Sequence, residues 1–330
     1  MDLVLNICDD LFLDALYSKV VPLTAFAHEI NGTLTSAAPV LLPALQKWHS
    51  LVAYLPHPPL TGLSNGSSAT FSSSQPTLSA WPRDYIPRQL ISLSVITLIG
   101  VHIVYFLFST LSYYLIFNHD MMRHPRFLKN QVWLEIKTSL AAFPVMTLLT
   151  LPWFEAEVLG WSKLYDDPAE YGYLYLAFSA LLFLVFTDYA IYWIHRLEHH
   201  PSVYKYVHKP HHKWLVPTPF ASFAFHPVDG YLQSLPYHIF IFLFPLHRWL
   251  YLGLFVFVQL WTILIHDSDM ITGHPLEKVI NGPAHHTLHH LYFTVNYGQY
   301  FTWADRWGGS YRQPSKELDP LLEVDKLKHD

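Results

Sequence analysis

The 330-residue chain is rich in hydrophobic (52%) and aromatic (16%) residues and poor in charged ones (14%), which is typical of a membrane protein or of a helical protein with deeply buried helices. Its formal net charge of −5 supplies no basic field, so a nucleic-acid partner is excluded. Cys8 is the single cysteine, which excludes an intramolecular disulfide and argues against a thiolate metal site.

The N-terminal quarter differs in composition from the rest. The stretch before the first long apolar run is rich in Pro, Ser, Thr and Gly and buries too little apolar surface to fold, so it is expected to be a linker. Two N-glycosylation sequons, at Asn31 and Asn65, lie in this quarter. Four segments are predicted: 1–54, of no assigned role; 55–88, a Pro/Ser-rich linker; 89–314, a membrane domain; and 315–330, a polar tail.

Charge-free runs predict the membrane spans. Three runs without Asp, Glu, Lys or Arg lie at residues 89–119, 138–154 and 171–187. The first exceeds the ~20 apolar residues that cross a bilayer, and the other two, of 17 residues each, lie at the short end of the spanning range. A fourth apolar block, 230–265, is interrupted at Pro245 and is expected to form a helical hairpin that spans the bilayer or dips into one leaflet. The fold predicted is an all-α, multi-span membrane helix bundle.

Histidines are concentrated after the third run. Fifteen of the 22 lie between residues 195 and 290, and nine form three spaced clusters: His195, His199 and His200; His208, His211 and His212; His286, His289 and His290. Residues three and four apart share one face of a helix, so each cluster aims two or three imidazoles at one point. Nine nitrogens exceed the needs of one four-coordinate metal, which favours a two-metal cage over a solvated polyhistidine surface. Imidazole suits Zn, Cu, Fe and Ni alike, so the residues leave the metal open.

Local chemistry places the clusters at helix ends. Pro201 disfavours helix in the residue before it, so the third membrane helix is expected to end at the first cluster. Pro210 fits the first turn of a new helix that the second cluster would open. The turn signal at 281–283 puts the third cluster in the first turns of the next helix. Asp188 precedes His195 by two helical turns and is predicted to accept its second N–H.

These clusters resemble the membrane-bound fatty acid hydroxylase/sterol desaturase superfamily, and the sequence between them resembles the sterol C-5 desaturases (lathosterol oxidases). The resemblance covers roughly residues 90–314. The matching stretches are IYWIHRLEHHP (191–201), HKPHHKWLVPTPFASFAFHPVDGYLQSLPYHIF (208–240), WTILIHD (261–267) and NGPAHHTLHHLYFTVNYGQYFTWADRWGGSYRQP (281–314).

The resemblance implies an O2-dependent, non-haem di-iron oxidoreductase. It would remove two hydrogens from C-5 and C-6 of a Δ7-sterol, with electrons from NAD(P)H through cytochrome b5 and its reductase. Because the chain has no HPGG haem-binding motif, the electron donor is expected to be a separate protein. The metal ligands that the resemblance implies are His195, His199, His200, His208, His211, His212, His266, His286, His289 and His290.

Two further histidines and two departures complete the comparison with the family. His285 is expected beside the metals without binding them, and His226 either binds a metal or supports one that does. Phe223 stands where these desaturases often carry histidine, and the stretch at 302–307 shifts a tryptophan. These departures leave room for an enzyme that acts on another sterol or a triterpenoid.

Three function classes therefore stay open. The first is a sterol C-5 desaturase. The second is a hydroxylase or methyl oxidase of the same superfamily acting on another sterol, triterpenoid or fatty-acyl lipid, because regiochemistry depends on fine substrate placement. The third is a metal-binding or transport protein without enzymatic activity. It is disfavoured because the histidines gather at one surface and do not line several spans.

Positive charge predicts the orientation. The loop 119–130 carries Arg123, Arg126 and Lys129 and is expected to face the cytosol. The third span then returns the histidine-rich di-metal cap and the tail to the cytosolic side. Residues 326–330 (KLKHD) resemble a dilysine retrieval signal of the endoplasmic reticulum, so a multi-pass protein of that membrane is expected.

Overall fold

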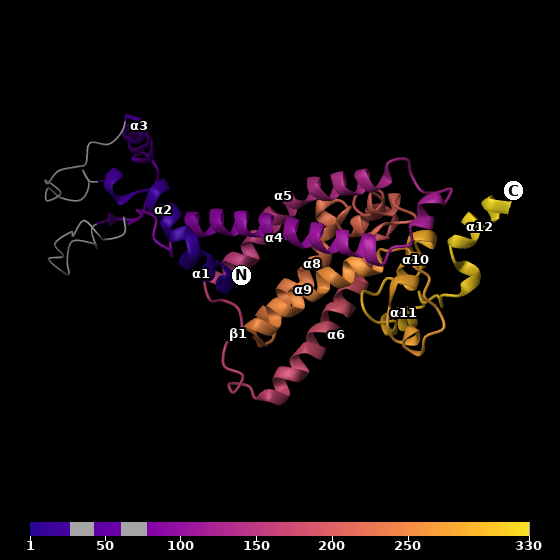
Figure 1. The fold of residues 1–330 in the computed structure, drawn as a ribbon. Coiled ribbons are helices and arrows are strands. Elements are labelled where there is room, and N and C mark those ends of the chain that lie inside the picture. The colour runs from indigo at the N-terminus through magenta and orange to yellow at the C-terminus, as the bar shows by residue number, and fades with distance from the viewer. Residues whose placement is uncertain (27–42, 61–77, 330) are drawn as a thin grey trace. The chain divides into compact units, whose positions relative to one another are not determined.

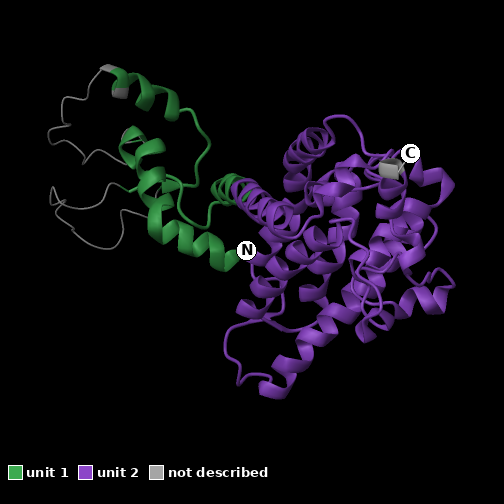
Figure 2. Cartoon of the chain, turned by 45° about the vertical axis from the view of Figure 1, so that its right-hand side comes forward, with its two compact units in different colours: residues 1–96 green, residues 97–330 purple. Residues whose placement is uncertain are grey.

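The computed structural model describes residues 1–26, 43–60 and 78–329, and this part of the chain is mostly helical, with almost no strand (Figure 1). The chain divides into two compact units, residues 1–96 and 97–330 (Figure 2). Both sequons lie outside the described residues. The elements are α1 (Asp2–Cys8), α2 (Asp14–Val20), α3 (Pro43–Val52), α4 (Ile86–Leu115), α5 (Gln131–Val158), β1 (Leu164–Tyr165), α6 (Tyr173–Glu198), α7 (Pro201–Tyr204), α8 (Pro227–Leu243), β2 (Leu246–His247), α9 (Arg248–Ile265), α10 (Pro283–Tyr292), α11 (Trp303–Gly308) and α12 (Leu321–His329).

The first unit is held together around a buried arginine. Arg88 donates to Asp9 at 2.6 Å and to the carbonyl of Trp81 at 2.9 Å, and it lies over the ring of Tyr17. The Trp81 indole in turn donates to the carbonyl of Pro56. The described ends of the predicted linker are therefore packed, because their few aromatic and charged side chains find partners in α2 and in the turn between α1 and α2.

Four helices are long and apolar enough to cross a membrane: α4, α5, α6 and α9. The three charge-free runs largely coincide with α4, α5 and α6, as the sequence predicts; the first run extends four residues beyond α4, and the third begins two residues before α6. The block 230–265 is divided into α8 and α9, of which α9 alone meets the length for a span. The prediction of an all-α, multi-span membrane bundle is confirmed.

The break between α8 and α9 has a local cause. Phe244 precedes Pro245 and adopts an extended conformation, which ends α8. The next two residues form β2, which pairs in parallel with β1. Tyr175 at the start of α6 donates to the Pro245 carbonyl at 2.9 Å. These contacts hold the turn beside the first residues of α6.

In the second unit, α8 packs against both α5 and α6 (Figure 1). One core cluster joins α6, α8 and α9 through residues that include Phe183, Phe240 and Leu254. A second joins α4, α5 and α9 to the segment 219–223. Phe223 lies in this second cluster, with its ring 5.6 Å from that of Tyr105, so the departure from the family pattern contributes an apolar side chain to a core.

A buried carboxylate clamps the segment after the second histidine cluster onto α5. Glu135 is fully buried and accepts from Gln131, from the Thr218 hydroxyl and from the Thr218 backbone N–H. Gln131 also donates to the Val216 carbonyl at 2.8 Å. Because these partners are inside the protein, the segment that follows the histidines has one defined position on the helix bundle.

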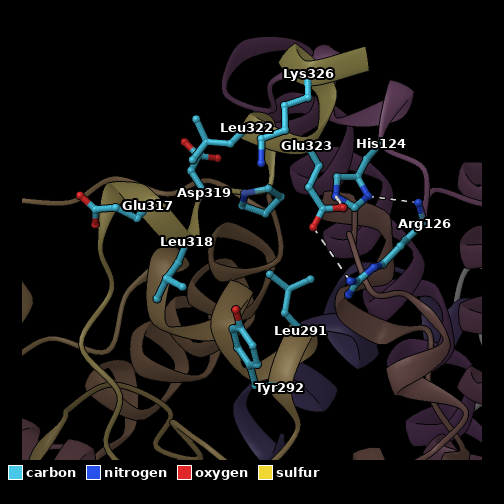
Figure 3. Close-up of a pocket in the computed structure, with 11 residues that line it drawn as sticks. His124, Arg126, Leu291, Tyr292, Glu317, Leu318, Asp319, Leu322, Glu323 and Lys326 are labelled. Carbon is cyan, nitrogen blue, oxygen red and sulfur yellow. Dashed lines mark hydrogen bonds and ion pairs between the residues drawn. The ribbon is translucent and has the colours of Figure 1, made fainter. Parts of the chain in front are cut away.

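The basic loop, the second cluster and the tail lie at the same end of this unit. Phe117 and Met121 pack with Val216, and Leu321 of α12 joins them. Glu323 approaches His124 at 3.2 Å and Arg126 at 3.9 Å (Figure 3). Beside these ion pairs is a pocket of about 200 Å³ between the tail and the end of α10, with side chains of both charges. The predicted common side of loop, histidines and tail is consistent with these contacts.

Candidate metal centre

Nine buried or half-buried histidines form two groups whose ring nitrogens converge. Within each group the converging nitrogens all lie within 4.8 Å of one another. The five-histidine group consists of His195, His199, His208, His212 and His289. The four-histidine group consists of His211, His266, His286 and His290.

The groups cut across the sequence clusters. His211 and His212 are adjacent in the sequence but belong to different groups, and the same is true of His289 and His290. On α10 the reason is helical geometry, because consecutive side chains point about 100° apart. The second cluster forms a short 3-10 turn, 211–213, in place of the longer helix expected there, and this turn separates its two rings in the same way.

Backbone carbonyls fix the tautomer of several ligands in the five-histidine group. His195 donates from Nδ1 to the Tyr297 carbonyl at 2.9 Å, and His289 donates from Nδ1 to the Val295 carbonyl at 2.7 Å. A carbonyl only accepts, so the proton is on Nδ1 and each Nε2 carries a lone pair. These Nε2 atoms are the ones that converge.

The convergence of lone pairs calls for a cation. His208 donates from Nδ1 to the Asp229 carboxylate at 2.8 Å, so its Nε2 is also unprotonated. That Nε2 lies 3.1 Å from the Nε2 of His195. Two lone pairs at this distance repel each other and form no hydrogen bond, whereas a metal ion between them binds both. The residues present therefore fit a bound metal ion.

The four-histidine group repeats the arrangement. His266 donates from Nδ1 to the Thr262 carbonyl at 2.6 Å, and His290 donates from Nδ1 to the Trp214 carbonyl at 2.9 Å. Their Nε2 atoms lie 3.0 Å and 3.1 Å from the Nε2 of His286. The Nε2 of His211 lies 3.2 Å from that of His266. Four imidazoles without a carboxylate or thiolate fit the same metals as the first group.

Electrostatics keep these rings neutral. Burial, and after it the neighbouring histidines, hold the pKa of His211, His286 and His289 well below the usual value. Burial lowers the pKa of His266 to about 4, and the Thr262 carbonyl opposes that shift. Because a metal binds the unprotonated ring, both groups are prepared for metal at neutral pH.

His200, which was predicted as a ligand, lies outside both groups in the structure. It is exposed, and its backbone is extended (φ −63°, ψ 135°) ahead of Pro201. Its Nδ1 accepts from the Ser202 N–H at 3.4 Å, which caps α7. The proline that ends α6 thus turns His200 away, while His199, still helical, points inward. The other nine predicted ligands are brought together.

Asp188 is buried, and its hydrogen bonds go to a loop and not directly to the predicted partner His195. Its Oδ1 accepts from the backbone N–H groups of 299, 300 and 301, at 2.7–3.2 Å. The second N–H of His195 goes to the Tyr297 carbonyl, which belongs to the same loop. Asp188 therefore holds the loop, and the loop holds the histidine.

Two buried carboxylates that sequence reasoning missed stand at His208. Asp229 accepts from its Nδ1, and Glu198 Oε2 lies 3.9 Å from the same atom. Gln233 donates to the other oxygen of Asp229 at 2.7 Å. A signal was present, because Asp229 is the only charged residue between Lys213 and Arg248.

The two histidines of open role lie outside both groups. His226 caps the N-terminus of α8 by accepting from the Val228 N–H. His285 is buried with its ring 5.8 Å from that of Tyr311. In the structure His226 therefore acts on α8, and neither of these two histidines converges with the nitrogens of the two groups.

A helical membrane bundle whose spans end at two adjoining groups of converging histidine nitrogens has the architecture of a membrane protein that can bind metal. The model of the fatty acid hydroxylase family matches residues 180–310. A Delta(7)-sterol 5(6)-desaturase of Gibberella zeae is 61% identical over 246 residues, 74% of this chain and 76% of that protein. One of Leptosphaeria maculans is 47% identical over 327 residues, 96% and 88% of the two chains. Lathosterol oxidase of Homo sapiens is 56% identical over 237 residues, which are 71% of this chain and 79% of that protein.

The chain belongs to this family of sterol desaturases, a branch of the fatty acid hydroxylases, and the resemblance noted from the sequence is confirmed. No solved structure matched the chain significantly.

Proposed function

We propose that the protein is a sterol C-5 desaturase that introduces a double bond between C-5 and C-6 of a Δ7-sterol. In each turnover the sterol gives up two hydrogens, a donor supplies two electrons, two protons are taken up, and one O2 becomes two waters. The observation that carries the proposal is the pair of adjoining all-histidine groups in a chain 56–61% identical to enzymes named for this reaction.

The nine histidines of the two groups are proposed to bind two iron ions. When bound, such a pair supplies the O2 chemistry that the protein's own side chains lack. The chain contributes position: carbonyls of Tyr297, Val295, Trp214 and Thr262 hold four rings with their lone pairs inward. Asp229 holds a fifth ring.

The chain also excludes water from the two groups. Apart from the half-buried His199, each of the nine side chains is at most 7% exposed. A dry site keeps the histidines unprotonated and limits reaction of the oxidant with anything but the sterol. An apolar substrate reaches such a site from the bilayer, which accounts for its place at the ends of membrane helices.

Electrons are proposed to come from NAD(P)H through cytochrome b5 and its reductase, acting from the cytosol. The contacts that bring the basic loop 119–130, the second cluster and the tail to one end support a common side. The protein is proposed to reside in the endoplasmic reticulum membrane with this end cytosolic. An epitope tag on the C-terminus should be digested by protease added to sealed microsomes, and protection would contradict this orientation.

The experiment that tests the reaction is a sterol profile of cells lacking the protein. Mass spectrometry should show accumulation of Δ7-sterols without the 5,6 double bond, reversed by the wild-type chain and not by a His289→Ala variant. An unchanged sterol pool with another lipid altered would move the function to a hydroxylase or methyl oxidase of the same superfamily.

A further inference from the structure

One face of α6 carries a continuous stripe of exposed, mostly large apolar side chains. Successive members are three or four residues apart, so they lie on one side of the helix. They are Leu174, Phe178, Leu181, Val185, Tyr189, Trp193 and Leu197. Because α6 is one of the candidate spans, this stripe is the surface that it offers to lipid.

The dimensions of the stripe match a bilayer. The whole stripe, from Leu174 to Leu197, rises about 35 Å along the helix, and its part up to Trp193 rises about 28 Å. The hydrocarbon core of a bilayer is about 30 Å thick, so Leu197 would lie just beyond it. Tyr171 and Tyr173 lie exposed at the N-terminal end of the stripe, and Trp193 lies near its C-terminal end. Aromatic side chains at both ends of a span are the usual markers of the two membrane interfaces.

The short helix α11 adds two tryptophans near the C-terminal end of the stripe. The ring of Trp303 stacks on that of Tyr189, with centroids 5.4 Å apart and planes 16° apart. The ring of Trp307 lies 6.4 Å from that of Trp193. Trp303 is 40% and Trp307 69% exposed, so both remain available for contact with something outside the protein.

Close packing fixes α11 in this position. Arg196 of α6 donates to the Gly308 carbonyl at 2.8 Å. A Cβ on Gly308 would lie 1.8 Å from the Tyr192 hydroxyl, so any larger residue there would force the buried Tyr192 to move. The two tryptophans are therefore held at one level of α6.

We propose that α11 lies in the headgroup region of the bilayer that α6 spans, with Trp303 and Trp307 as its anchors. Tryptophan favours this region because its ring is apolar and its N–H is polar. The patch continues the lipid-facing stripe without a gap. A protein partner or second copy would have to approach at the level of the bilayer boundary, so lipid is the occupant that the stripe favours.

The anchor connects to the histidines through α11 itself. Asp305 of α11 accepts from the backbone N–H groups of Tyr297 and Gly298, each at 2.8 Å. The Tyr297 carbonyl accepts from His195 of the five-histidine group. The loop that orients a ligand is thereby fixed to a helix resting on the membrane surface, which sets the depth of the site relative to the lipid.

The test measures the depth of a label on full-length protein in phosphatidylcholine vesicles. A nitroxide is placed at Trp307→Cys in a Cys8→Ser background, and its collisions with O2, which partitions into lipid, and with a water-soluble nickel chelate are compared. Leu181→Cys in the middle of the stripe gives the bilayer value, and Leu322→Cys on α12, 43% exposed, gives the aqueous value. We expect the ratio of O2 collisions to nickel-chelate collisions at position 307 to lie between the bilayer and aqueous values, and severalfold above the aqueous value.

A second measurement uses the native tryptophans and needs no introduced cysteine or label. Brominated lipids should quench native tryptophan fluorescence less in the Trp303→Phe, Trp307→Phe double variant than in the wild type. A nickel accessibility at Trp307 equal to that at Leu322 would overturn the proposal. Protection from both reagents, together with a concentration-dependent dimer in detergent, would overturn it in favour of a second copy of the chain. None of these readouts depends on sterol desaturation.

Discussion

The two histidine groups are alike in ligand chemistry and unlike in what surrounds them. In the five-histidine group, His208 donates to Asp229, with Glu198 close by. In the four-histidine group, the hydrogen bonds from Nδ1 that the described residues show go to backbone carbonyls. A carboxylate makes its histidine partner a more basic ligand than a carbonyl does. The difference means that two metals held by imidazoles alone would have unequal affinity and electronic character.

The groups also differ in origin. The five-histidine group takes ligands from all three sequence clusters, whereas the four-histidine group takes none from the first and recruits His266 from the end of α9. The first group therefore depends on the end of α6, and the second on the end of α9. A change confined to one helix end separates them experimentally.

The largest effect is expected from removing one ligand of each group. His289→Ala and His290→Ala should each reduce sterol turnover to background, because each deletes one of the converging nitrogens of its group. The proteins should remain in the membrane, since the spans are unchanged. Metal analysis of the purified variants should show about one metal fewer per chain than the wild type. Full turnover in His289→Ala at wild-type abundance would contradict the five-histidine group as described.

A more selective change neutralises the carboxylate. Asp229→Asn keeps an acceptor for His208 but removes its charge, so the five-histidine group should bind metal about 10–100-fold more weakly. Competition with a chelator measures this, and Mössbauer spectra of 57Fe-loaded protein should show one of two iron signals altered. Glu135→Gln, a buried neutralisation that touches no ligand histidine, is the matched control and should leave both signals unchanged. Equal weakening of both metals would remove the inequivalence argued here.

The ligand type and most of the ligand positions could be predicted from the sequence, because spacing along a helix determines which side chains share a face. The division into two groups could not, since it depends on where α9 and α10 pack in three dimensions. Asp229 was recognisable as a lone charge in an uncharged stretch, but its partner lies 21 residues away in the chain. The hydrogen-bond partners of Asp188 could not be predicted for the same reason, because the 299–301 backbone reaches it from over a hundred residues away.

A substitution at Asp188 is expected to lower the stability of the protein more than its affinity for metal. An Asp188→Asn variant loses the charge that accepts three backbone N–H groups, and a hydrogen bond to a charged group contributes about 1.5–3 kcal/mol. We expect a lower unfolding temperature in detergent, also in metal-free protein. Turnover per bound metal should fall less than in Asp229→Asn. An unchanged unfolding temperature would show that the loop keeps its position without this carboxylate.

The smallest effect is expected at His200, which belongs to the first histidine cluster of the sequence but to neither group in the structure. His200→Ala removes an exposed side chain and a weak cap, and such surface changes alter free energies by about 0.5 kcal/mol, a factor of roughly two. Its neighbour His199 converges with His212 and His289 at 3.1–3.2 Å, so His199→Ala should lose turnover and metal. The pair differs by one position in sequence and by a helix end in structure. If both variants lost metal to the same extent, His200 would be a ligand and α6 would have to continue past Pro201 when metal is bound.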